Sequence, residues 1–332
     1  MPLYTWQQQD WQVLNGTHSR WPHALLLAGQ AGIGKVDFAR ELAHSLLCEQ
    51  PQPDHRPCGH CEACTWLRQG NHPDFREVTL LVDDESDGED GKSKKAPTQI
   101  SIKQVRELTD FVNVSSHRGG HRVTLLHPAE AMNAAAANAL LKTLEEPPPG
   151  ALFILVSHQP QRLLPTIRSR CRVFGLSLPE RTEAEAWLTA QGVNNAALTL
   201  AQAGYAPLAA LTLADEAMQA ERRQFISALA QPARLDPLQL AESWQKTDMT
   251  KLVDWLQKWL YDLLSYELSG IIRYHPDRQA DLDRLAKTID PLRLAEFDKT
   301  LVEARRFAHH PLNPKLALEQ LFFGYIEAMT GV

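Results

Sequence analysis

A glycine-rich turn between an apolar run and a helical pattern constrains the fold of this 332-residue chain more than any other stretch. Residues 24–28, ALLLA, have the composition and length of a buried strand, and residues 29–35, GQAGIGK, follow at once. Beyond Lys35 the apolar residues recur at three- and four-residue steps, which is typical of a helix. A strand, a glycine loop and a helix in this order predict a phosphate loop in an α/β core.

The residues of this loop fit a phosphate ligand with one exception. Gly29, Gly32 and Gly34 would let the backbone wrap a phosphate, and the helix N-terminus would direct its N–H groups at the anion. Lys35 would reach the outer phosphates, but the expected magnesium-binding Ser or Thr is replaced by Val36. We therefore expect phosphate-loop ancestry with ATP binding that is weak or absent. The alternative is a glycine turn that only joins strand to helix.

The carboxylates that ATP hydrolysis needs are missing further along the chain. Residues 123–126, VTLL, predict the next strand, and His127 and Pro128 follow it. In a phosphate-loop ATPase an acidic pair stands there, one acid for magnesium and one for the attacking water. Glu130 lies two residues too far along to replace them. The chain is therefore not expected to hydrolyse ATP on its own.

Four of the five cysteines lie close together in the sequence, at Cys48, Cys58, Cys61 and Cys64. This spacing predicts a tetrahedral thiolate site for one structural Zn²⁺. An iron–sulfur cluster is the alternative, because the CxxCxxC pattern also occurs there, although the usual following Cys-Pro is absent. The fifth cysteine, Cys171, is predicted to be a core residue.

Composition limits the class of protein. Hydrophobic residues make up 44% of the chain, charged residues 22%, and the net charge is −6, without the basic excess of a protein that grips nucleic acid by itself. The start of the sequence lacks the features of a signal peptide, and no apolar run is long enough to span a membrane. We expect a cytoplasmic protein without membrane contact. Residues 83–95, DDESDGEDGKSKK, predict a mobile surface loop.

Two further motifs make the interpretation more specific. Residues 138–148 are NALLKTLEEPP, and residues 169–171 are SRC. Together with the four-cysteine module after the glycine-loop helix, they resemble the bacterial DNA polymerase III clamp loader family of AAA+ proteins. The resemblance covers roughly residues 1–215, and the remainder is similar only in its helical character.

The resemblance implies an AAA+ α/β core at residues 1–177 with a zinc-binding insert at 48–64. An all-α lid at 178–215 and an all-α collar for oligomerisation at 216–332 would follow. It also implies that Arg170 is an arginine finger, which reaches the γ-phosphate of ATP on a neighbouring subunit. A guanidinium is always charged and matches phosphate geometry. Arg168 is interpreted as a solvated surface charge.

The family contains active gamma/tau ATPases and a kind of subunit with eroded nucleotide motifs that keeps SRC. Val36, His127, Pro128 and Pro207, the last in place of the lid arginine, resemble the eroded kind. The implied function is a largely static subunit of the ring that loads the sliding clamp onto primed DNA. Its implied partners are the gamma/tau and delta subunits. An active gamma/tau-type ATPase and a free-standing zinc-bearing regulator are the alternatives.

Overall fold

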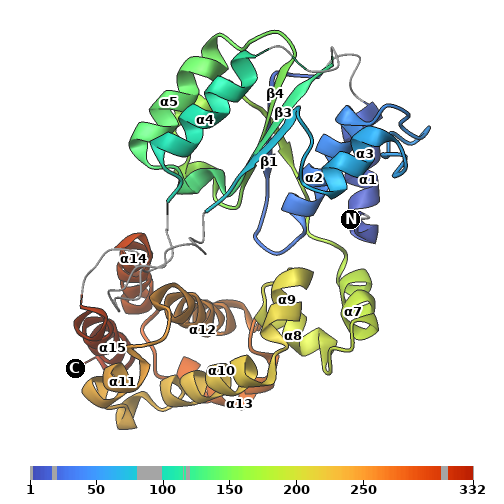
Figure 1. Ribbon diagram of the computed structural model, residues 1–332. Helices are drawn as coiled ribbons and strands as arrows, with labels where there is room; N and C mark the ends of the chain where they lie inside the picture. The colour runs from blue at the N-terminus through green and yellow to red at the C-terminus, as the bar shows by residue number, and fades with distance from the viewer. Residues whose placement is uncertain are drawn as a thin grey trace, which may run out of the picture. The chain divides into compact units, whose positions relative to one another are not determined.

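The computed structural model describes residues 3–16, 21–80, 99–114, 116, 120–307 and 313–331. The acidic stretch 83–95 lies outside these residues. The chain divides into two compact units, Met1–Glu183 and Ala184–Val332 (Figure 1). Each unit has its own apolar core.

The first unit is built on a parallel sheet of the order β2-β3-β4-β1-β5. Its strands are β1 (Ala24–Ala28), β2 (Phe75–Val78), β3 (Arg122–Leu126), β4 (Ala151–Ser157) and β5 (Arg172–Gly175). All residues of β1, β3 and β4 are buried, which explains why most of them are apolar; Arg122, Thr124 and Ser157 are the exceptions. These three strands confirm the predicted α/β core. The edge strands β2 and β5 were not predicted, because both are short and partly exposed.

Helices cover both faces of the sheet. They are α1 (Gln8–Gly16), α2 (Lys35–Leu47), α3 (Glu62–Arg68), α4 (Ile102–Asn113), α5 (Ala134–Glu145) and α6 (Pro165–Arg168), with short 3₁₀ turns at Thr5–Gln7, Ala129–Ala131 and Pro160–Arg162. Figure 1 shows α4 and α5 on one face and α2 on the other. Ser101 caps α4 by accepting from the backbone N–H of Gln104, and α5 ends before Pro147, which disfavours a helical residue in front of it.

The second unit is entirely helical in its described residues. It contains most of α7 (Arg181–Ala190) and all of α8 (Ala196–Gln202), α9 (Pro207–Leu213), α10 (Glu216–Leu229), α11 (Pro237–Trp244), α12 (Met249–Ser269), α13 (Gln279–Ala286), α14 (Pro291–Phe307) and α15 (Pro314–Thr330), with 3₁₀ turns at Pro232–Arg234 and Pro276–Arg278. The helices from α7 to α9 share one small apolar cluster, and those from α10 to α15 share a larger one. The division into a lid at 178–215 and a collar at 216–332 stays a prediction.

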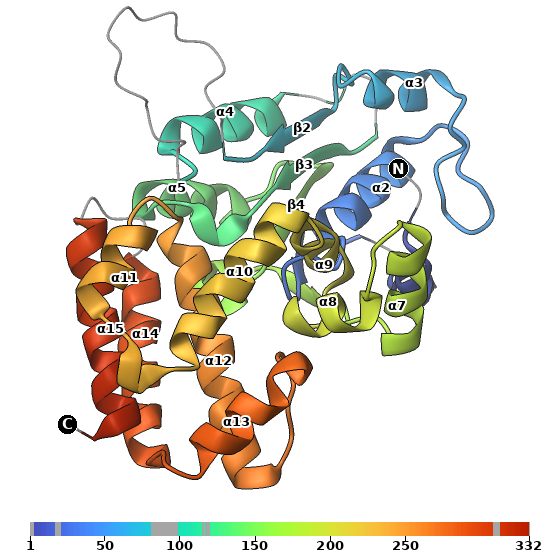
Figure 2. The same ribbon diagram turned by 90° about the horizontal axis from the view of Figure 1, so that it is seen from below.

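The tryptophan-rich stripe of α12 forms the centre of the larger cluster. Trp255 and Trp259, four residues apart on one face of this helix, are buried there. Trp259 donates from Nε1 to the Tyr325 hydroxyl at 2.9 Å, and that hydroxyl donates to the carbonyl of Leu229 at 2.7 Å. Figure 2 shows the neighbouring helices α12, α14 and α15 side by side. The two hydrogen bonds link α12, α15 and α10 inside an apolar core.

None of the described helices has both the length and the apolar composition of a membrane span. Across the described ranges, no single helix is long and apolar enough to cross a bilayer. The pair α8 and α9 reaches that composition only when the two are joined, and they are bent by 105° at the break between them. Both helices contribute to the small apolar cluster of the second unit.

Candidate functional site

The four predicted metal ligands come together at one place in the first unit. Cys48 ends α2, Cys61 caps α3, Cys64 lies in its first turn and Cys58 lies in the loop between them. Their Sγ atoms all lie within 4.8 Å of one another, with 3.9 Å from Cys48 to Cys61, 3.9 Å from Cys58 to Cys64 and 3.6 Å from Cys48 to Cys64. Thiolates about 2.3 Å from a tetrahedral zinc are about 3.8 Å apart, so the four residues fit this ion.

Backbone groups also prepare the sulfur atoms for a cation. The N–H groups of Cys58, Cys61 and Cys64 donate to the Sγ atoms of Cys48, Cys58 and Cys61 at 3.3, 3.3 and 3.4 Å. A hydrogen bond from the backbone of His60 lowers the pKa of Cys58 to about 6, whereas burial raises the pKa of Cys64. Four sulfur ligands and no open position are typical of a structural metal site. His60 is not needed, since its ring Nδ1 lies 2.9 Å from the carbonyl oxygen of Cys58.

The glycine loop adopts the expected place between β1 and α2. Gly34 is the residue before α2 and has φ +84°, a left-handed conformation that favours glycine. The side chain of Lys35 is 2% exposed, and its Nζ donates to the carbonyl of Gln30 at 2.6 Å. Burial lowers the pKa of Lys35 to about 8, and the nearby carboxylate of Glu130 acts in the opposite direction. The lysine is therefore present but engaged within its own loop.

The N-terminal segment lies against this loop, which the sequence did not reveal. Gln7 is 1% exposed and donates from Nε2 to the carbonyls of Ile33 at 3.0 Å and Gly34 at 2.8 Å. Trp6 donates to the carbonyl of Ile33 at 3.1 Å. Tyr4 donates its hydroxyl to Asp37 at 3.2 Å, and a Cβ atom at Gly34 would lie 2.6 Å from its ring. The segment thus fixes the conformation of the loop.

A second unpredicted contact lies at the end of β3. Nε2 of His127 is 2.7 Å from Oε1 of Glu77, and Arg40 approaches the same oxygen at 2.6 Å. These two partners lower the pKa of Glu77 to about 2, against the opposing effect of burial. Glu77 comes from the edge strand β2, some fifty residues before His127, so no local spacing could reveal it. Its carboxylate is engaged by two cationic or polar partners and does not replace the missing acids.

Arg170 lies just after α6 and is partly exposed, with 33% of its side chain accessible. Its Nη1 donates to the carbonyl of Thr166 at 2.9 Å, and its Nη2 lies 2.7 Å from Oε1 of Glu145 at the end of α5. Cys171 is buried, as predicted for a core residue, and burial raises the pKa of its thiol to about 12. Arg168 is exposed.

Comparison with known proteins assigns the chain to a family. Residues 6–180 match the model of the family "DNA polymerase III, delta subunit", and residues 216–325 match "DNA polymerase III, delta subunit, C terminal". The DNA polymerase III subunit delta-prime of Pseudomonas aeruginosa PAO1 is 39% identical over 275 residues, which cover 80% of this chain and 79% of that protein. The chain belongs to the family of delta-prime subunits of DNA polymerase III. The predicted family resemblance is thus confirmed.

Two other relatives separate the delta-prime family from the gamma/tau alternative. The delta-prime subunit of Yersinia pestis is 34% identical over 323 residues, 92% of this chain and 89% of that protein. The tau subunit of Salmonella typhimurium is 36% identical over only 154 residues, 46% of this chain and 21% of tau. The far longer match to delta-prime than to tau therefore favours delta-prime.

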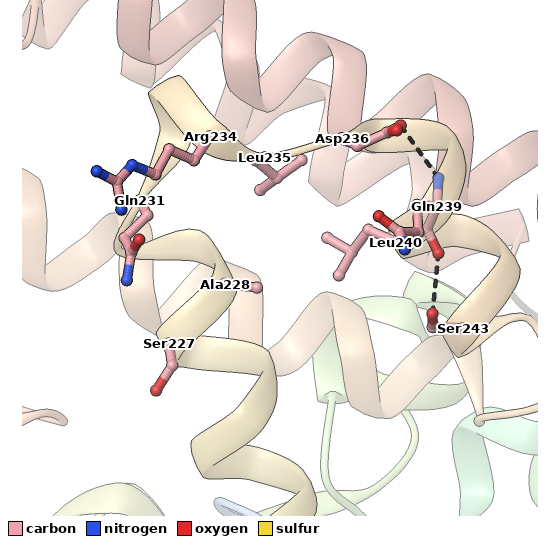
Figure 3. A pocket seen from close by; sticks show the side chains of 9 residues that line it. All are labelled: Ser227, Ala228, Gln231, Arg234, Leu235, Asp236, Gln239, Leu240 and Ser243. Carbon is pink, nitrogen blue, oxygen red and sulfur yellow. Dashed lines mark hydrogen bonds between the residues drawn. The ribbon is translucent and has the colours of Figure 1, made fainter.

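Two pockets of this delta-prime family member lie away from the residues discussed above. One of about 400 Å³ lies in the second unit between α10 and α11 (Figure 3). It is lined by Ser227, Ala228, Gln231, Arg234, Leu235, Asp236, Gln239, Leu240 and Ser243. The other, of about 590 Å³, is lined by residues around Trp21, His121 and Pro147–Pro149. Neither of these two pockets is lined by a predicted site residue.

Proposed function

We propose that this chain is a clamp-loader subunit that does not hydrolyse ATP itself and supplies Arg170 in trans to a neighbouring ATPase subunit. The observation that carries the proposal is a contrast within the first unit. Lys35 is buried and engaged by its own loop, whereas Arg170, in the middle of the SRC motif, remains partly exposed. A nucleotide in this loop would have to draw Lys35 away from the carbonyl of Gln30.

The chemistry around the loop supports the non-hydrolysing role. Val36 has no oxygen with which to hold magnesium, and His127 stands where a carboxylate would orient water. Of the acids near this loop, Glu77 is bound by Arg40 and His127. Glu130, whose carboxylate lies near Lys35, accepts a hydrogen bond from the backbone N–H of His158 at 3.0 Å. An exposed guanidinium needs none of these groups, because it acts on a phosphate held by another subunit.

The cysteine cluster supports a structural zinc. Cys48, Cys58, Cys61 and Cys64 would each give one thiolate and close the coordination shell. Bound Zn²⁺ supplies no reaction here and holds the loop of residues 48–64 to the end of α2. Because such ligands meet only in the folded chain, the binding energy of the ion stabilises this part of the fold.

The proposed partners follow from the family. We propose the gamma/tau and delta subunits as direct neighbours, the helical residues 216–332 as the assembly part and 178–215 as the lid. The sliding clamp and primed DNA would be reached through the complex, in the cytoplasm. A net charge of −6 agrees with an indirect role at DNA, since phosphate contacts require a basic surface.

The test is the steady-state ATPase rate of complexes rebuilt with wild-type or Arg170→Ala chain, with clamp and primed DNA present and assembly matched by gel filtration. Arg170→Ala should lower the rate only in part, because other interfaces keep their own arginines. Arg170→Lys should rescue poorly, since an ammonium lacks the planar fork. Arg168→Ala is the matched control and should leave the rate unchanged.

Equal rates with wild-type and Arg170→Ala chain would contradict the arginine-finger role and show that Arg170 is only a surface charge. The isolated chain provides the second arm. Wild-type and Lys35→Ala chains should show the same background ATP turnover. A turnover that Lys35→Ala abolishes would contradict the non-hydrolysing role and favour an ATPase of the gamma/tau type.

A further inference from the structure

The guanidinium of Arg170 is held from two sides by its own chain. Its Nη1 donates to the carbonyl of Thr166 at 2.9 Å, and its Nη2 lies 2.7 Å from a carboxylate oxygen of Glu145. A guanidinium carries five N–H donors in a rigid plane, so these two contacts leave the others available. The two contacts orient the side chain and leave N–H donors with which it can bind a further ligand.

Both ends of this ion pair are fixed by buried neighbours. Glu145 is the last residue of α5 and follows Leu144, which is buried. Arg170 lies between Ile167 and Cys171, which are buried in the same apolar core as Leu144. The backbones of the two partners therefore cannot shift independently. A carboxylate at this place sets the direction in which the arginine extends.

The strength of the contact also fits an orienting role. The side chains of Arg170 and Glu145 are 33% and 50% exposed, and an ion pair this exposed contributes little to stability. A terminal phosphate carries more negative charge than a carboxylate, and its oxygens can accept from the guanidinium N–H groups that Glu145 leaves available. Glu145 can thus hold the arginine in one rotamer, but it cannot keep the arginine from a phosphate that comes within reach.

We propose that Glu145 is the positioning residue of Arg170, which it holds in the conformation that meets the γ-phosphate of ATP on the neighbouring subunit. The inference rests on the proposed function of Arg170. Fixing the long side chain beforehand removes part of the entropy lost when it binds. Under this proposal Glu145 and Glu146, the two adjacent acids of the LEEPP motif, differ in role. Glu146 is exposed and makes no ion pair within the part of the chain that the structure describes.

The experiment uses complexes rebuilt with Glu145→Ala, Glu145→Gln or Glu146→Ala chain, assayed for ATP turnover with clamp and primed DNA. Glu145→Ala should produce about half of the loss in kcat caused by Arg170→Ala, with KM for ATP unchanged. Glu145→Gln should retain most of the activity, because its amide oxygen can still accept from Nη2. Glu146→Ala, one residue away and equally acidic, should behave like the wild-type chain.

A double variant and a thermal melt separate positioning from other effects. Adding Glu145→Ala to Arg170→Ala should cause no further loss, since nothing remains to be positioned. All single variants should melt like the wild-type chain, and Glu145→Ser replaces Glu145→Ala if the latter melts lower. If Arg170→Ala lowers turnover but Glu145→Ala does not, the positioning role is wrong and the proposed function stands. A higher rate with Glu145→Ala would show that Glu145 restrains the arginine, and no effect of Arg170→Ala would overturn both.

Discussion

Lys35 shows how burial changes what a phosphate-binding residue contributes. The residue is 2% exposed, its ammonium donates to the carbonyl of Gln30, and burial lowers its pKa to about 8. A charged group in such a place costs free energy that its hydrogen bond offsets only in part. The charge of Lys35 therefore lowers the stability of the fold, and stability alone does not explain why a lysine stands at this position.

The cost of burying Lys35 should depend on pH. Between pH 8 and 10.5 the folded chain binds fewer protons at this site than the unfolded chain, so wild-type stability rises with pH across that window. Lys35→Met, which removes the charge, should raise the free energy of unfolding by about 1–2 kcal/mol at pH 7. The gain should shrink as the pH approaches 10. Denaturant unfolding of zinc-loaded protein at several pH values measures it, and a gain that grows with pH would contradict the buried charge.

The N-terminal segment and the glycine loop act as one local structure. Tyr4, Trp6 and Gln7 bond to α2 and to the residues just before it, and Trp11 donates to the carbonyl of Asp54 in the cysteine-bearing loop at 2.8 Å. The segment therefore links the glycine loop with the loop that carries the metal ligands. Neither link could be predicted from the sequence, because each joins side chains of the N-terminal segment to oxygen atoms that are far away in the chain.

A methyl group at Gly34 tests this packing. Gly34→Ala must adopt φ +84° and bring Cβ to 2.6 Å from the ring of Tyr4. The matched control is Gly70→Ala, which has φ +75° and no atom within 4 Å of its Cβ. Gly34→Ala should destabilise the fold by about 1–2 kcal/mol more than the control, measured by denaturant unfolding. Adding Tyr4→Ala should remove part of that excess, because Nε2 of Gln7 also lies only 2.8 Å from this Cβ. An excess that Tyr4→Ala leaves unchanged would contradict the contact with the Tyr4 ring.

Comparison of particular elements shows what the sequence could predict. The strands β1, β3 and β4 were predictable because burial on both faces favours runs of apolar residues, as in residues 24–28, 125–126 and 151–156. The edge strands β2 and β5 are partly exposed, so polar residues are tolerated there and no apolar run marks them in the sequence. In the same way the cysteine cluster follows from local spacing, whereas Glu77, Gln7 and Glu145 reach their partners only through the folded sheet and helices.

The two compact units give the whole molecule two separate sources of stability. The first has a sheet core together with the cysteine cluster, and the second has a helical core around Trp259. Chains of this kind commonly unfold in more than one step. Loss of the metal should therefore affect the first unit alone.

Chelation tests this independence. Metal analysis should find about one zinc per chain and no iron, and a strong chelator or Cys61→Ser should lower the melting temperature of one calorimetric transition while leaving the other in place. Cys171→Ser is the control, since Cys171 lies outside the cluster and should not change zinc content. A coloured, iron-containing protein would contradict the zinc site. A simultaneous shift of both transitions would contradict the separation of the units.

The segment that lies on the glycine loop has a consequence for physiology. A loop whose shape depends on a bound nucleotide changes with the supply of that nucleotide in the cell. Here Gln7 and Trp6 hold the loop, and Gln30 accepts a hydrogen bond from its lysine, all within one chain. We therefore expect this part of the protein to keep the same form in a starved cell as in a rapidly growing one, whatever the ratio of ATP to ADP.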